Sequence, residues 1–277
     1  MKVNGLKQHL AAGRPTFGSW VSLAHPWSTR VLARAGFDWL TVDLEHAPIA
    51  WDEAALMFAL IADNGCVPLA RVPVGSHDHI KRALDGGAWG VIVPMVDTAE
   101  QAKAAVAAAK YPPTGDRSTG GGLHALSFGT TTADYYAHAD DQTVVVVQIE
   151  SPTGIANLRA ICAVPGVDAI LVGPNDLRTF MRTASGPPSP AELEAAIERV
   201  RQIGAETGTP TGIVTFDAES ALARAASGMT LIGVSSDVLF MTSKATEVVQ
   251  RLSAVRNGRA TQPVPGSVGE SGGAGQR

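Results

Sequence analysis

The chain has 277 residues, of which 45% are hydrophobic, 17% charged and 5% aromatic. This composition is typical of a globular protein with a sizeable core, and it excludes a disordered or fibrous chain. The formal net charge of −4 lacks the basic excess that a nucleic-acid binder needs, so we expect small molecules as partners and no nucleic acid.

The two cysteines, Cys66 and Cys162, lie far apart in the sequence and form no C-x-x-C motif. The sequence therefore predicts neither a disulfide framework nor a structural zinc site. The first residues lack the continuous apolar core of a secretory signal, and nowhere do about 18 apolar residues run together as a membrane span requires. We therefore expect a cytoplasmic protein without a membrane segment.

Short runs rich in Val, Ile and Leu alternate with Ala-rich stretches of helical period, which predicts a parallel sheet covered by crossover helices. An N-terminal extension helix precedes them. The expected strands are 16–23, 38–44, 67–72, 90–96, 143–150, 168–173, 211–216 and 230–235. The expected helices are 27–35, 52–63, 77–86, 98–110, 153–163, 190–207, 217–227 and 238–256. Four of them are expected to begin at the capping residues Asp52, Ser76, Thr98 and Asp217.

Eight such units predict an α/β fold, a (β/α)8 or TIM barrel that forms a single domain over residues 1–256. A doubly wound sheet is the alternative, but no G-x-G-x-x-G turn follows the first strand. Residues 112–134 are too long and glycine-rich for an ordinary connection, so we expect a functional loop there. The Gly-, Ser- and Pro-rich residues 257–277 predict a disordered tail that carries no chemistry.

Barrel enzymes carry their reactive groups at the carboxyl ends of the strands, and these ends are unusually polar here. Glu150 follows a run of four valines, where a bare carboxylate is unfavourable unless a cation or hydrogen-bond donors compensate. Asp176 follows the next strand, and two carboxylates with open positions suit Mg²⁺, Mn²⁺ or Co²⁺ better than tetrahedral zinc. The alternative for both residues is a cap on the following helix.

Arg71 ends the third strand, where a guanidinium is suited to bind a substrate carboxylate; a salt bridge to a neighbouring strand end is the alternative. His46 stands three residues after Asp43, and we expect Asp43 to orient its imidazole as a general base. A purely structural histidine is the alternative. His25, after the first strand, and His124, in the glycine-rich segment, are weaker candidates for which we favour a structural role, and His77 and His79 are assigned no role.

Schiff-base chemistry needs a buried lysine on a barrel strand, yet every lysine falls in the N-terminal segment or on an expected helix. No G-x-S-x-G elbow occurs, and no cysteine stands beside a plausible base. These exclusions leave metal-assisted acid–base chemistry.

The chain resembles the HpcH/HpaI family of class II, metal-dependent 2-oxo-acid aldolases over roughly residues 5–255. The motifs that carry this resemblance are GFDWLTVDLEHAP (36–48), RVP (71–73), IKRALDGGAWGVIVPMV (80–96), YPPTGDR (111–117), VVVVQIES (144–151) and VDAILVGPNDL (167–177). The resemblance implies a metal-dependent aldehyde-lyase that reversibly cleaves 4-hydroxy-2-oxo acids to pyruvate and an aldehyde. It also implies a last helix exchanged between partners, in a homohexamer built as a trimer of dimers.

The resemblance places the family's metal ligands at Glu150 and Asp176, its pyruvate-binding arginine at Arg71, and its base pair at His46 and Asp43. It adds two residues, namely Asp85, contributed from a neighbouring subunit, and Gln148, near the bound oxo acid. We also expect substrate contacts at the end of the sixth strand from Gly173, Pro174 and Asn175.

Two departures from the family pattern bear on the substrate. Arg117 is followed by the run Ser118–Gly122 where relatives continue with Gly and an apolar residue, and Arg178 stands where relatives carry a small residue. The aldehyde acceptor is therefore left open. The alternatives to the aldolase are an oxaloacetate decarboxylase, a CoA-ester lyase, for which we find no basic route for the nucleotide, and a noncatalytic barrel that binds an oxo acid.

Overall fold

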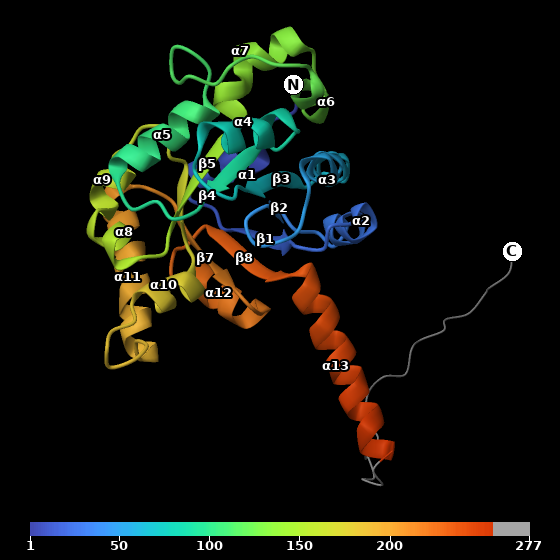
Figure 1. Ribbon diagram of the computed structural model, residues 1–277, viewed down its shortest axis with the longest axis vertical. Helices are drawn as coiled ribbons and strands as arrows, with labels where there is room; N and C mark the ends of the chain where they lie inside the picture. Colours follow the sequence, from blue (N-terminus) through green and yellow to red (C-terminus); the bar gives the residue numbers. More distant parts are fainter. Residues whose placement is uncertain (257–277) are drawn as a thin grey trace, which may run out of the picture. The chain divides into compact units, whose positions relative to one another are not determined.

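The computed structural model describes residues 1–256, in which eight parallel strands close into a barrel in sequence order (Figure 1). The predicted (β/α)8 architecture is confirmed. The barrel lies in a compact unit, Met1–Val238, and the described residues from Leu239 to Arg256 belong to a second unit. The predicted single domain over 1–256 stays a prediction, and the predicted tail 257–277 lies outside the described residues.

Every strand overlaps its predicted range, and most end earlier than predicted. The strands are β1 (Thr16–Val21), β2 (Trp39–Asp43), β3 (Val67–Arg71), β4 (Gly90–Val93), β5 (Val144–Ile149), β6 (Ala169–Val172), β7 (Thr211–Thr215) and β8 (Leu231–Ser236). The residues predicted beyond these ends belong to the loops and helix starts that surround the carboxyl end of the barrel.

The helices also follow the predicted alternation, with four additions. They are α1 (Gly5–Ala11), α2 (Pro26–Ala33), α3 (Trp51–Asp63), α4 (His77–Asp85), α5 (Ala99–Ala109), α6 (Leu123–Ser127), α7 (Thr132–Gln142), α8 (Pro152–Ala156), α9 (Leu158–Cys162), α10 (Pro174–Phe180), α11 (Pro190–Thr207), α12 (Ala218–Ala226) and α13 (Asp237–Arg256). The helix predicted over 153–163 is divided at Asn157 into α8 and α9. The segment 112–134 contains α6 and the start of α7, and α10 follows β6 where we expected a loop.

Three of the four predicted caps are confirmed. Ser76, Thr98 and Asp217 each accept a hydrogen bond from the backbone N–H three residues ahead. Asp52 was predicted wrongly, because α3 already begins at Trp51 and Asp52 lies inside its first turn. There the Ala50 N–H donates to the Glu53 carboxylate at 3.0 Å instead.

The alternation of side chains along the strands divides the core into two layers. In β5, Val145 and Val147 pack in the cluster that joins the strands to the outer helices, whereas Val144 and Val146 pack in the barrel interior. Because successive side chains point to opposite faces, this register directs the residues that follow at even positions toward the barrel axis.

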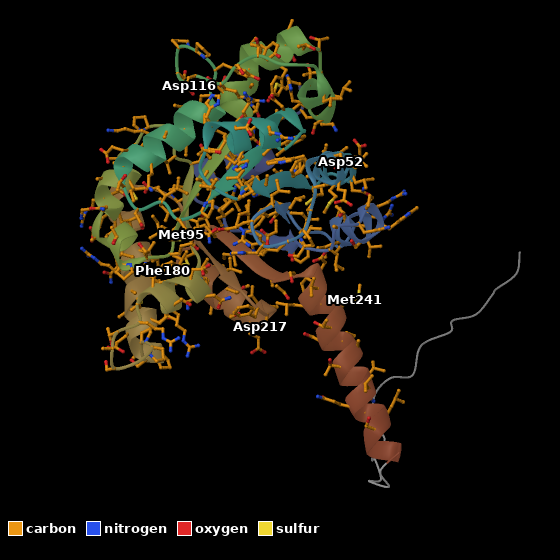
Figure 2. All side chains as sticks on the ribbon, viewed as in Figure 1. Asp52, Met95, Asp116, Phe180, Asp217 and Met241 are labelled. Carbon is orange, nitrogen blue, oxygen red and sulfur yellow. The ribbon has the colours of Figure 1, made fainter. Side chains whose placement is uncertain are left out.

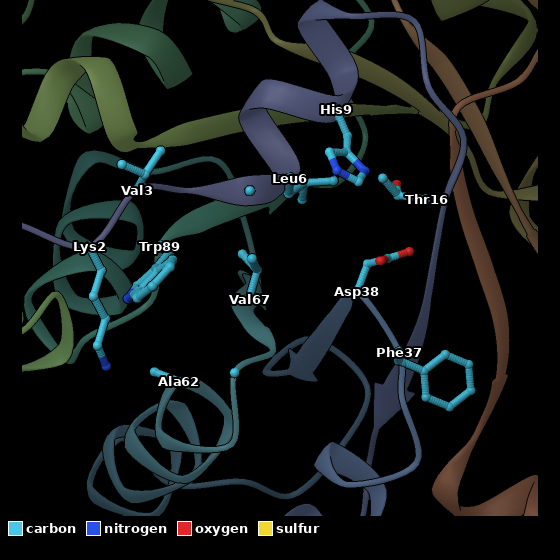
Figure 3. Close-up of a pocket in the computed structure, with 12 residues that line it drawn as sticks. Lys2, Val3, Leu6, His9, Thr16, Phe37, Asp38, Ala62, Val67 and Trp89 are labelled. Atoms are coloured by element: carbon cyan, nitrogen blue, oxygen red, sulfur yellow. The ribbon is translucent and has the colours of Figure 1, made fainter.

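The amino-terminal end of the barrel is covered by α1, whose Leu6 and Leu10 join the interior cluster. A cavity of about 540 Å³ opens beside this helix, and in Figure 3 His9 of α1 faces Thr16 and Asp38 across it. The cavity is lined by residues at strand starts, such as Val67 and Trp89, so it lies at the opposite end from the predicted site. Within the described residues, no helix has the length and apolar character of a membrane span.

Candidate active site

The predicted site residues converge because they share one strand register. Asp43 and Arg71 are paired neighbours at the ends of β2 and β3, two residues beyond Thr41 and Leu69. Gln148 and Glu150 continue the inward-facing series of Val144 and Val146 at the end of β5. A two-residue period therefore directs all four polar side chains into the carboxyl-terminal mouth of the barrel.

Arg71 and Asp43 form a bidentate ion pair. Arg71 Nε donates to Asp43 Oδ1 at 2.9 Å, and Nη2 donates to Oδ2 at 2.7 Å. The guanidinium also lies over the Trp20 ring, 4.5 Å from its centroid, so cation–π attraction adds to the pair. The predicted alternative for Arg71, a salt bridge to a neighbouring strand end, is thus present. This contact uses Nε and one Nη2 hydrogen, and it leaves the Nη1–Nη2 edge turned away from Asp43.

Glu150 is buried at the end of β5 and held by two donors. The Met95 N–H donates to Oε1 at 2.8 Å, and Gln148 Nε2 donates to Oε2. Met95, labelled in Figure 2, follows β4 and has φ of 53°, a left-handed conformation that a non-glycine residue rarely adopts. The carboxylate is therefore fixed in orientation by backbone and side-chain contacts before any ligand arrives.

Burial raises the pKa of Glu150 above its ordinary value. The hydrogen bonds from Met95 and Gln148 oppose this rise, and the nearby charges of Asp176 and Glu45 add to it. Asp176 lies in the first turn of α10, directly beyond β6. The negative charges of Glu45 and Asp176 thus lie close enough to act on Glu150, and a bound cation would stabilise such a group of carboxylates.

The residues around Glu150 have the chemistry and the space to hold a divalent cation. Gly173 is so close that a Cβ added there would lie 2.4 Å from Glu150 Oε2 and 2.6 Å from Gln148 Nε2. Gln148 Oε1 is buried without a hydrogen-bond partner among the described residues. These residues fit a cation that takes two carboxylates and completes its sphere with other oxygens. Within 1–256, no ready-made cluster of three or more His, Cys, Asp or Glu ligands occurs.

Glu45, and not Asp43, is the carboxylate beside the imidazole of His46. His46 Nε2 lies 3.8 Å from Glu45 Oε2. Asp43 Oδ1 accepts the backbone N–H groups of Glu45 and His46, each at 3.2 Å, and is hydrogen-bonded to the backbone of His46 rather than to its ring. The expectation that Asp43 orients the imidazole is therefore corrected, because the Asp43 carboxylate is engaged by Arg71. The His46 side chain is 62% exposed at the mouth of the barrel.

Glu45 is a site residue that the sequence reasoning did not single out. Its carboxylate lies 3.3 Å from Arg71 Nε, and burial raises its pKa although the charges of Arg71 and His46 oppose the rise. One feature of the sequence could have identified Glu45: it stands two residues after Asp43, in the same polar segment at the end of the second strand. Asp43 and His46, on either side of it, were chosen as the site residues of this segment instead.

Asp85 is the one predicted residue that the structure places apart from the others. It ends α4, shortly before β4 begins at Gly90, and so lies at the amino-terminal end of its own barrel. There it pairs with the fully buried Arg117 at 2.7 Å, and the ring of His124 lies 4.0 Å away. His124, a weaker candidate from the sequence, thus belongs to the surroundings of Asp85.

The three predicted substrate contacts at the end of β6 also lie at the mouth. Gly173 precedes α10 as its N-cap, and Pro174 begins the helix. Asn175 is exposed one residue further on, directly before Asp176. Their roles in substrate binding stay predictions.

Known proteins are similar to this chain in sequence and in fold. The sequence pattern of the family HpcH/HpaI aldolase/citrate lyase matches residues 16–243. The chain belongs to this family. The hydroxypyruvate/pyruvate aldolase of Cupriavidus necator is 37% identical over 245 residues, which cover 88% of this chain and 91% of that protein. The 5-keto-4-deoxy-D-glucarate aldolase of Klebsiella pneumoniae is 40% identical over 237 residues, covering 85% and 91%.

A solved structure of a family member from Burkholderia cenocepacia is similar over the whole barrel. It superimposes with a TM-score of 0.84 at 34% identity, covering 91% of this chain and 100% of that one. The resemblance predicted from sequence motifs is thereby confirmed. At the level of the family, so is the predicted enzyme class, a carbon–carbon lyase of the aldolase type.

Proposed function

We propose that this protein is a class II pyruvate aldolase that reversibly cleaves 4-hydroxy-2-oxo acids to pyruvate and an aldehyde. The observation that carries the proposal is the fixed Glu150 carboxylate beside Asp176, at the same barrel mouth as the oriented guanidinium of Arg71. Membership of an aldolase family and the aldolase names of relatives at 37% and 40% identity support it.

Glu150 and Asp176 are the residues that would hold a divalent cation, Mg²⁺, Mn²⁺ or Co²⁺. When bound, such a cation supplies Lewis-acid stabilisation of the charge that develops on the keto oxygen. Gln148 and Gly173 shape the space next to this position, with Gly173 leaving room that a side chain would fill.

Arg71 binds the carboxylate of the oxo acid through its Nη1–Nη2 edge. Asp43 already holds the opposite edge of the guanidinium, so the plane of the fork is set before substrate binds. This preorganisation lowers the entropy cost of orienting the substrate and places positive charge beside the forming enolate.

His46 removes the proton from the C4 hydroxyl in the cleavage direction. The C3–C4 bond then breaks, its electron pair remains on C3 as the pyruvate enolate, and the hydroxyl carbon leaves as an aldehyde. Glu45 lies beside the ring, with its Oε2 3.8 Å from His46 Nε2. Solvent supplies one proton to C3, which completes pyruvate, and His46 returns the proton it took to solvent.

We further propose that Asp85 serves the site of a neighbouring subunit in a homohexamer built as a trimer of dimers. Its position at the opposite end of its own barrel favours a role in another copy. In α13, which the resemblance expects to be exchanged, Met241, Val249 and Leu252 are exposed apolar residues that packing against another copy would bury.

The proposed function is tested by pyruvate enolisation, which requires no aldehyde. The protein is incubated with pyruvate and Mn²⁺ or Mg²⁺ in D₂O, and loss of the methyl proton signal is followed by NMR. We expect metal-dependent exchange well above the rate with metal alone, and its loss in Glu150→Ala. Exchange no faster than metal alone would overturn the aldolase and favour a noncatalytic barrel. A panel of aldehydes offered with pyruvate then identifies the acceptor.

A further inference from the structure

We propose that a hydrogen bond between Ser151 and Asp97 positions the Glu150 carboxylate for the divalent cation, acting through the backbone of Met95. Asp97 and Ser151 are positioning residues in this proposal, because they contact neither the substrate nor the cation. The inference rests on the proposed function and adds two residues to its cation site.

The connection between β4 and α5 contains a residue in an unfavourable conformation, and its N–H meets the proposed metal ligand. Met95 has φ of 53°, which is sterically costly for a residue with a Cβ. In this conformation its N–H donates to Glu150 Oε1 at 2.8 Å, and the next N–H, of Val96, donates to the Gln148 carbonyl oxygen at 3.2 Å. Since such a conformation persists only where surrounding contacts hold it, other residues must maintain this turn.

Asp97 supplies such contacts, because its N–H, its carbonyl oxygen and its carboxylate each have a partner. The N–H donates to Gln101 Oε1 at 2.7 Å. The carbonyl oxygen accepts from Asn157 Nδ2 at 2.8 Å, and carboxylate Oδ1 accepts from the Ser151 hydroxyl. Ser151 and Asn157 both follow β5 in the chain, so Asp97 joins the connection after β4 to the connection after β5.

Ser151 is itself fixed beside Glu150. It is buried, it follows Glu150 directly, and as the N-cap of α8 its Oγ accepts the Gly154 N–H at 3.0 Å. The hydroxyl hydrogen is thereby left for Asp97. A Cβ added at Gly154 would lie only 3.1 Å from Asp97 Oδ1 and from the Val96 carbonyl oxygen. The two connections are therefore in close contact beside the proposed metal ligand.

This contact bears on the cation because the partners of a metal ligand set the direction of its donor atoms. Met95 donates to one oxygen of Glu150 and Gln148 donates to the other. Without the Ser151–Asp97 hydrogen bond, we expect Met95 to relax toward the negative φ that residues with a Cβ prefer. Its N–H would then turn away, and the Glu150 carboxylate would lose one of the two donors that orient it.

The test measures the dissociation constant of Mn²⁺ in the absence of substrate, from the electron paramagnetic resonance signal of free Mn²⁺. In D97A we expect this constant to rise about tenfold, as is typical when a partner of a metal ligand is removed. D97N keeps an oxygen that can accept from Ser151, so it should bind Mn²⁺ like the wild type. The matched control E100A removes an exposed carboxylate from the first turn of α5 and should also match the wild type.

A second variant separates positioning from a general loss of structure. Glycine adopts positive φ without the steric cost of a Cβ, so M95G/D97A should bind Mn²⁺ at least about threefold more tightly than D97A. A hydrogen bond that only stabilised the fold would allow no such recovery, because glycine restores none of the lost contacts.

Four outcomes would overturn the positioning role: an unchanged constant in D97A, a D97N variant as weak as D97A, an equal rise in E100A, or no recovery in M95G/D97A. E150A, measured beside them, separates this failure from failure of the proposed function. Binding that is lost in E150A but unchanged in D97A rejects the positioning role alone. Absence of Mn²⁺ binding in the wild type, or binding unchanged in E150A, rejects the proposed cation site and the positioning role together.

Discussion

Arg71 and Asp43 face each other across β2 and β3 and make two parallel hydrogen bonds, of 2.9 and 2.7 Å. The pair sets the plane of the guanidinium and leaves one edge for a substrate carboxylate. It also removes Asp43 from the imidazole of His46, whose ring lies against Glu45 instead. Because Asp43 is bound to Arg71, Glu45 is the carboxylate that lies beside His46 in the mouth of the barrel.

Replacing the guanidinium by an ammonium tests the two-edge role of Arg71. Lysine keeps the charge but cannot bind Asp43 on one edge and a carboxylate on the other. For Arg71→Lys we expect kcat/KM for pyruvate exchange to fall by roughly ten- to a hundredfold. Arg34→Lys, at an exposed position after α2, is the control and should match the wild type. Unchanged exchange in Arg71→Lys would contradict the role.

The division of labour between His46 and the enolisation residues can be measured in one variant. His46→Asn removes the base for the C4 hydroxyl, so we expect kcat for cleavage of a 4-hydroxy-2-oxo acid to fall by about 10² to 10⁴. Pyruvate deuterium exchange should fall much less, because it needs no proton from C4. Glu45→Gln should lower cleavage in the same direction by a smaller factor. Equal losses in both assays would instead make His46 the base for C3.

Gly173 provides a steric test of the proposed cation position. A Cβ there would lie 2.4 Å from Glu150 Oε2, so Gly173→Ala must displace the carboxylate even though its φ of −94° permits alanine. We expect Mn²⁺ to raise the melting temperature of the wild type but not of Gly173→Ala. Gly121→Ala, where an added Cβ meets nothing within 4 Å, is the control. A wild-type response in Gly173→Ala would place the cation elsewhere.

Lys110 predicts a stability that rises in mild alkali. Burial lowers its pKa to about 8, while the unfolded chain restores the ordinary value of 10.5. Below pH 8 both states are charged, and between pH 8 and 10.5 the folded state releases its proton first, so folding becomes more favourable as pH rises.

We therefore compare the free energy of unfolding at pH 7.5 and 9.5 by urea denaturation. The wild type should gain about 2 kcal/mol over this interval relative to Lys110→Met. Lys103→Met, at an exposed position on α5, serves as the control and should follow the wild type. A gain in Lys110→Met equal to that of the wild type would show that another group is responsible.

The sequence by itself determined the architecture and named most residues of the candidate site. Eight apolar runs alternating with helical stretches predicted the barrel, because a strand buried on both faces reads as a continuous Val, Ile and Leu run. The polar residues at the ends of those runs predicted Asp43, Arg71, Gln148 and Glu150 as site residues. Every second side chain of a strand points into the barrel, and this alternation continues beyond the last buried apolar residue. The breaks at Asn157 and the short α6 and α10 escaped prediction because such short segments carry too little periodicity.

Only the tertiary structure decided which partner each polar group takes. Sequence spacing placed Asp43 near His46, but the register of β2 against β3 gives Asp43 to Arg71 and leaves Glu45 for the imidazole. Likewise, the left-handed backbone at Met95 and the close approach of Gly173 depend on strands far apart in sequence. Pairings of this kind arise from distances across the barrel, which a one-dimensional pattern does not contain.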